Sequence, residues 1–129
     1  MKRKVAVWVS ALMLVFASYA FASSLVFLAA SDGQNFYLER ESLTYSADTK
    51  IINSWIKVSK DDASDYLMIN YLFNTQTLQM KPLKIQQYDK AGHLKKDNEI
   101  KQDWEPIGAD ENLVVYKKIL ACVEQDKKN

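Results

Sequence analysis

Hydrophobic residues repeat at two different periods along this 129-residue chain, and the change comes near its end. From residue 24 to about residue 89, short apolar runs alternate with polar turns, which is typical of β-strands. From Asp110 to Gln125 the period becomes that of an α-helix, with no Gly or Pro to interrupt it. Because short turns favour antiparallel pairing, the sequence predicts an α+β domain: a meander of five or more strands followed by one helix.

Five strands are predicted from the apolar runs, at residues 24–29, 35–39, 50–59, 66–74 and 78–89. Residues 40–49 are polar and are expected to form a short helical turn or a loop. The 66–74 strand is apolar on both faces, so we expect it to be central in the sheet and covered on each side.

Two of these strands allow their faces to be assigned by alternation. In the 50–59 strand one face carries Ile52, Ser54, Ile56 and Val58, and the other carries Ile51, Trp55 and Lys57. In the 78–89 strand Leu83 and Ile85 are predicted on one face, and Met80 and Tyr88 on the other. Pro82 has no N–H for the strand ladder, so it marks an edge, a bulge or a break.

The C-terminal segment is predicted to be an amphipathic helix that covers the sheet. At about 100° per residue its apolar side chains form one continuous arc, made by Leu113, Val115, Tyr116, Ile119, Leu120 and Val123. Asp110 is the expected N-cap, and Glu111 suits the positive end of the helix dipole. Cys122 lies at the margin of the arc.

Cys122 is the single cysteine of the chain, so it cannot form an internal disulfide. Two roles remain open. It is either a small buried residue, which is common for free cysteines and is the role we favour, or it pairs between chains to form a homodimer.

The N-terminus has the features of a secretory leader. Lys2, Arg3 and Lys4 precede an apolar run at residues 5–17, and Ala20-Phe21-Ala22 supplies the small-x-small cleavage pattern. We therefore predict a signal peptide at residues 1–22, cleaved after Ala22, and a mature domain at 23–129. The mature chain is then exported to the periplasm or the cell surface, without membrane insertion after cleavage.

The alternative for this segment is an uncleaved anchor. A membrane-spanning helix needs about 20 apolar residues, and residues 5–30 are long enough to supply them. Four serines interrupt the segment, and residues 24–30 are needed as a strand. These two features favour cleavage.

The charge balance argues against nucleic acid as a partner. Cleavage removes three of the 17 basic residues and none of the 16 acidic ones, leaving 14 against 16. The two signs are interspersed, whereas nucleic-acid binding requires a concentrated basic face. A mature chain of this length suits one domain with one core.

No pattern in the sequence assigns a catalytic, metal or cofactor site. His93, the only histidine, follows Gly92 in a predicted turn, where a solvated role is favoured over that of a general base. A nucleophilic pair of Cys122 with His93 lacks any activating signature. Asp61, Asp62 and Asp65 lie together but lack the ligand spacing of a calcium loop, so a polar hairpin turn is expected.

The many aromatic residues are expected to lie mostly in the core, because most of them fall in strands at period two. Tyr45 and Tyr66 are the expected exposed exceptions. No binding residue is assigned from the sequence.

Five short motifs together resemble the bacterial surface-adhesin protein E family. They are "FYLERESL" (36–43), "INSWIKV" (52–58), "YDKAGHL" (88–94), "WEPI" (104–107) and "ILACVE" (119–124). The resemblance covers about residues 25–124. It implies an antiparallel sheet of five to six strands, with one C-terminal helix packed on its concave face. It also implies an exported, non-enzymatic binding domain whose partners are host extracellular-matrix or plasma proteins.

The chain departs from this family at one disulfide. The resemblance implies a bridge from Cys122 to a strand cysteine, but residues 74–77 read "NTQT". We therefore expect packing of the apolar arc to hold the helix. A second reading of function also stays open: a periplasmic structural or envelope-maintenance protein of the same fold, which contacts an envelope component and has no adhesin role.

Overall fold

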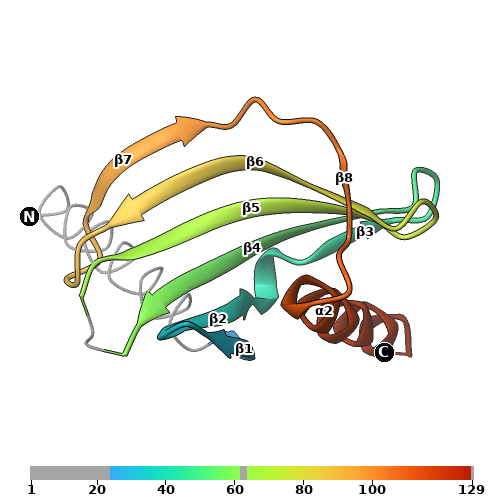
Figure 1. Ribbon diagram of the computed structural model, residues 1–129. Helices are drawn as coiled ribbons and strands as arrows, with labels where there is room; N and C mark the ends of the chain where they lie inside the picture. Colours follow the sequence, from blue (N-terminus) through green and yellow to red (C-terminus); the bar gives the residue numbers. More distant parts are fainter. Residues whose placement is uncertain (1–23, 62–63, 129) are drawn as a thin grey trace, which may run out of the picture.

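The computed structural model describes residues 24–61 and 64–128 (Figure 1). The predicted signal peptide and its cleavage site after Ala22 lie outside these residues.

One antiparallel sheet and one C-terminal helix make up the described chain, so the predicted α+β class is confirmed. The strands follow the order β1-β2-β4-β5-β6-β7, while β3 pairs with β4 and β8 pairs with β6. The elements are β1 (Leu25–Ser31), β2 (Gln34–Glu39), the 3₁₀ turn η1 (Arg40–Ser42), β3 (Thr44–Ser46), β4 (Ile51–Lys60), β5 (Tyr66–Asn74), β6 (Gln79–Tyr88), β7 (Leu94–Glu99), β8 (Glu105–Pro106) and α2 (Glu111–Lys128).

Over the described residues the sheet has eight strands rather than the five to six expected. The three additional strands, β3, β7 and β8, carry little apolar signal. Every residue of β7 is exposed, and β3 and β8 are only three and two residues long. Such strands form by backbone hydrogen bonds to a neighbouring strand. Hydrophobic periodicity in the sequence does not reveal these bonds.

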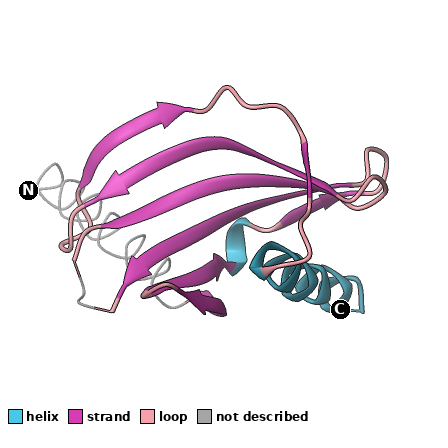
Figure 2. Cartoon of the chain, viewed as in Figure 1, coloured by secondary structure: helices cyan, strands magenta, loops and turns pink. Residues whose placement is uncertain are grey.

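The core lies between the concave face of the sheet and α2 (Figure 2). The predicted alternation of β4 is confirmed, because Ile52, Ser54, Ile56 and Val58 are all buried. The complete core cluster is Leu28, Leu38, Ile52, Ile56, Val58, Phe73, Tyr116, Ile119 and Val123. Burying each large apolar side chain contributes roughly 1.5–3 kcal/mol to the stability of the fold. Packing within this cluster therefore holds α2 on the sheet.

Helix α2 begins and packs as the sequence predicts. The Oδ1 atom of Asp110 accepts a hydrogen bond from the Asn112 N–H at 3.0 Å, which is an N-cap interaction. Tyr116, Ile119 and Val123 are buried, and Cys122 is partly buried against the same core.

A β-bulge at Pro82 changes the faces of β6. Asn70 pairs with Lys84, but the next residue, Tyr71, pairs with Pro82, so one extra residue lies in β6. Of the three alternatives that Pro82 left open, an edge, a bulge or a break, the structure has the bulge. It places Met80 on the concave side, opposite Phe73, while Tyr88 faces outward opposite Tyr66. The predicted pairing of Met80 with Tyr88 on one face was wrong, because strict alternation fails across a bulge.

Strand β5 is central, between β4 and β6, as predicted. Within the described residues a second layer covers it on one face only. Helix α2 covers the concave face, whereas the outer face of β5 carries Met68 and Asn70, which are buried without a described helix above them.

Candidate binding face

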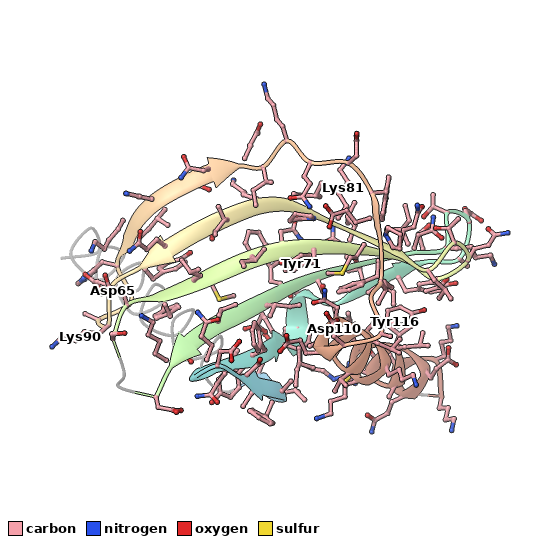
Figure 3. All side chains as sticks on the ribbon, in the orientation of Figure 1. Asp65, Tyr71, Lys81, Lys90, Asp110 and Tyr116 are labelled. Atoms are coloured by element: carbon pink, nitrogen blue, oxygen red, sulfur yellow. The ribbon has the colours of Figure 1, made fainter. Side chains whose placement is uncertain are left out.

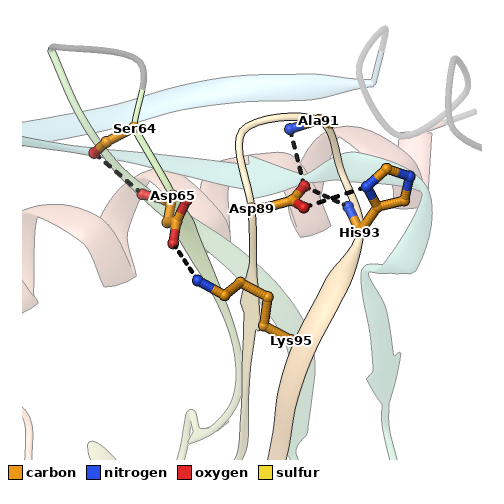
Figure 4. Close-up of polar contacts among 6 residues, drawn as sticks. All are labelled: Ser64, Asp65, Asp89, Ala91, His93 and Lys95. Atoms are coloured by element: carbon orange, nitrogen blue, oxygen red, sulfur yellow. Dashed lines mark hydrogen bonds and ion pairs between the residues drawn. The ribbon is translucent and has the colours of Figure 1, made fainter.

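His93 stabilises the turn between β6 and β7 (Figure 4). The Oδ1 atom of Asp89 accepts hydrogen bonds from the backbone N–H groups of Ala91 and His93, both at 2.9 Å, and Oδ2 lies 3.2 Å from the His93 Nδ1 atom. The backbone hydrogen bond from His93, followed by the contact with its side chain, holds the pKa of Asp89 below its ordinary value. The His93 side chain is 80% exposed, which confirms a solvated turn residue.

The structure does not bring His93 and Cys122 together. The β6–β7 turn lies at one end of the sheet and α2 lies at the other (Figure 1). Figure 3 shows the same separation through Lys90, which is in the turn, and Tyr116, which is on the helix.

The acidic residues of the β4–β5 connection have separate partners. The Asp65 carboxylate lies 2.9 Å from the Lys95 ammonium on β7, and this hydrogen bond raises the pKa of Lys95 (Figure 4). The Asp61 carboxylate accepts a hydrogen bond from Asn35 Nδ2 at 2.6 Å. Asp62 lies outside the described residues. Within residues 24–61 and 64–128 no three His, Cys, Asp or Glu side chains are grouped to hold a metal ion.

The same part of the chain contains no helix with the length and apolar character needed to cross a membrane.

The aromatic residues divide between the two faces of the sheet. Phe73 and Tyr116 are in the core, with ring centroids 5.8 Å apart, and Tyr45 and Tyr71 pack against it. Tyr45, one of the two expected exposed exceptions, is therefore partly buried, and the Lys127 ammonium lies 4.7 Å from its ring centroid. The aromatic residues of the concave face are in or against the core, as expected, whereas those of the outer face are not part of it.

A row of outward-facing residues crosses the other face of the sheet. Phe27 pairs with Tyr37 between β1 and β2, and Tyr37 pairs with Lys57 between β2 and β4. The row continues through Met68 and Gln86 to the edge strand β7. The Phe27 and Tyr37 rings meet edge to face, with centroids 5.7 Å apart, and Phe27 is 51% exposed.

Beside this row two tyrosines form a stack. The Tyr66 and Tyr88 rings are nearly parallel, with centroids 5.2 Å apart, and the Lys57 ammonium lies 4.3 Å from the Tyr66 ring centroid. Desolvation by burial lowers the pKa of Lys57 and raises that of Tyr66. We call Phe27, Tyr37, Lys57, Tyr66 and Tyr88 the outer-face cluster.

The sequence reasoning missed most of this cluster. Tyr66 was expected to be exposed, and it is half-buried against Tyr88. Lys57 was correctly placed on the outer face of its strand. The Tyr66–Tyr88 pair could have been found by letting the Pro82 bulge shift the register of the β5–β6 hairpin by one residue.

Comparison with known proteins gives no relative. No protein-family model, no curated protein and no solved structure matches the chain.

Proposed function

We propose that this chain is an exported, non-enzymatic binding domain and that the outer-face cluster is its ligand-contacting surface. Its ligand is a host extracellular-matrix or plasma protein, which is what the resemblance to the surface-adhesin protein E family implies. The observation that carries the proposal is the concentration of four aromatic rings and one lysine on the outer face of the sheet. Helix α2 reaches this cluster through Lys118, whose ammonium lies 5.6 Å from the Phe27 ring centroid.

The geometry of the cluster suits a protein ligand. Tyr and Phe supply large contact areas with few rotatable bonds, which keeps the entropic cost of binding low. Tyr66 and Tyr88 already hold each other in place by stacking, so this part of the surface is pre-organised. Burial removes part of the hydration of Lys57 and lowers its pKa, so a carboxylate from a partner would meet a partly desolvated cation.

The second candidate is an envelope-maintenance protein that stays in the periplasm and uses the same face on an envelope component. The rings and the lysine would serve either partner. The two candidates differ in location, so protease treatment of intact cells distinguishes them. Release of the domain supports the adhesin, and protection of the domain until the cells are opened supports the periplasmic protein.

Binding is tested with the purified protein against immobilised laminin, fibronectin and fibrinogen. The double variant Phe27→Ser with Tyr66→Ser removes two rings of the cluster. If these rings are interface hot spots, affinity for the bound protein falls by at least about 30-fold. The matched control is Leu78→Ser, which removes an apolar side chain that is 54% exposed in the turn between β5 and β6, at the other end of that hairpin from Tyr66 and Tyr88. It leaves binding unchanged.

Equal affinity of the double variant and the wild type would show that the outer-face cluster is not the contact surface. Absence of binding to all three matrix and plasma proteins, together with protection from protease in intact cells, would favour the periplasmic candidate.

A further inference from the structure

An open cleft of about 690 Å³ lies on the outer face of the sheet, in the row next to the outer-face cluster. The row that forms its floor runs from Asn70 through Lys84 to Glu99. The cleft is lined by Asn70, Lys81, Leu83, Lys84, Glu99, Ile100, Lys101, Gln102 and Asp103. Its volume is within the range of about 300–1,000 Å³ that is usual for small-molecule sites.

The Pro82 bulge explains why the chain leaves space here. The Ile100 N–H still donates to the Leu83 carbonyl at 2.9 Å, directly after β7. Pro82 has no N–H to offer to a neighbouring strand. The chain therefore leaves the β6 edge after Ile100 and returns to it only at β8, beside Gln79 and Met80 (Figure 1).

Asn70 supplies a buried polar group to the cleft floor. It is 8% exposed, and its Nδ2 atom donates to the Asn53 Oδ1 atom at 2.6 Å and to the Ser54 carbonyl at 2.9 Å. Both amide hydrogens are thereby used. The Asn70 Oδ1 atom has no hydrogen bond from any described residue, so an acceptor remains for a ligand.

The charged groups that line the cleft are balanced. Among the described residues, Lys81 and Lys101 form no ion pair, and neither do Glu99 and Asp103. Lys84 is already neutralised by Asp97, whose carboxylate lies 3.3 Å away. The cleft thus presents ammonium donors and carboxylate acceptors in equal number, which favours an uncharged ligand whose groups both donate and accept hydrogen bonds.

Two tryptophans neighbour residues of this lining without being part of it. Trp55 pairs with Asn70 across β4 and β5 and so shares its face. Trp104 directly follows Asp103, and the Lys81 ammonium lies 5.9 Å from its ring centroid. The apolar side chains in the lining itself are Leu83 and Ile100. Apolar groups beside polar ones suit a molecule with C–H faces and hydroxyl edges.

We propose that this cleft binds a neutral oligosaccharide. Its hydroxyl groups would bond to the Asn70 side-chain carbonyl and to the charged side chains of residues 99–103. Its C–H faces would lie against Leu83 and Ile100. The site is separate from the outer-face cluster, and it does not depend on the proposed protein ligand.

The test uses the purified protein with chitotriose, cellotriose and maltotriose in ligand-observed saturation-transfer NMR. We expect at least one of them to bind. The double variant Lys101→Ala with Asp103→Ala removes one donor and one acceptor, both exposed, and weakens that binding by about tenfold or more. The control variant Lys90→Ala with Asp48→Ala removes the same two charge types at turns away from the cleft and leaves binding unchanged.

Three results would overturn the proposal. One is the absence of saturation transfer to all three sugars, and another is equal binding by the cleft variant and the control. The third is binding of a sulfated heparin tetrasaccharide or of an extended peptide in place of the neutral sugars, because the cleft would then be an anion site or a peptide groove. The Phe27→Ser, Tyr66→Ser variant keeps sugar binding if the two sites are distinct.

Discussion

The Arg40 guanidinium donates two hydrogen bonds to the Asp126 carboxylate, at 2.7 and 3.0 Å. Arg40 lies in η1, directly after β2, and Asp126 lies in the last turns of α2, 86 residues further along the chain. The pair therefore ties the end of the helix to the sheet. Here a bidentate ion pair and apolar packing hold the helix.

Replacing Asp126 by Asn is expected to lower the free energy of unfolding by about 0.5–1 kcal/mol. The effect is small because the two side chains are 25% and 52% exposed and are screened by solvent. Urea denaturation followed by circular dichroism measures it. The control is Glu124→Gln, which breaks a more exposed pair with Lys127 within the helix and should change stability by less.

Arg40→Gln combined with Asp126→Asn tests whether the two residues act together. If they do, the free energy of unfolding of the double variant is no lower than that of the less stable single variant. Fully additive losses would show that the bidentate pair has no coupling energy.

Packing of α2 should contribute far more than this ion pair. Ile119 is completely buried in the core, so Ile119→Ala is expected to lower the free energy of unfolding by about 2–5 kcal/mol, through lost burial and the cavity left behind. Val114→Ala, on the exposed side of the same helix, is the control and should change it by less than about 0.5 kcal/mol. The measurement is the same urea transition. Equal effects of the two variants would mean that α2 is not anchored through this face.

The parts of the fold that the sequence predicts are those in which one periodic pattern decides burial. The arc of α2 and the alternation of β4 are such parts, and both are confirmed. The N-cap at Asp110 was also predictable, because a short acidic side chain precedes an uninterrupted helical stretch.

The parts that it does not predict depend on pairing between strands. Strand β7 is wholly exposed, so no apolar pattern marks it, and only the ladder with β6 makes it a strand. Pro82 indicated an edge, a bulge or a break without deciding among them. The bulge shifts the register, and that shift is what brings Tyr88 opposite Tyr66. The Tyr66–Tyr88 stack of the outer-face cluster and the polar cleft both follow from this register. For this reason the candidate sites could not be read from alternation within single strands.

Cys122 should react slowly with a thiol reagent in the native protein and quickly in urea. Its side chain is only partly accessible and packs against the core cluster. Labelling with Ellman's reagent gives both rates. Ile119→Ala should raise the native rate, because it loosens the packing of the same helix. Equal native and unfolded rates would contradict this packing, and a disulfide-linked dimer on a non-reducing gel would favour the pairing between chains.

The β6–β7 turn should lose order at low pH because of Asp89. Hydrogen bonds from the backbone and side chain of His93, together with the Ala91 N–H, hold the pKa of the folded-state carboxylate below its ordinary 3.8. A lowered pKa means that the stabilising effect is fully present above the unfolded-state pKa. It is lost as the pH falls through the folded-state pKa. The amide resonances of Ala91 and His93 should therefore shift with a midpoint below pH 3.8, and Asp89→Ala should abolish that transition. Asp48→Ala, a change at an exposed turn elsewhere, should leave it in place. A midpoint at or above the ordinary value would show that the carboxylate does not hold these N–H groups in solution.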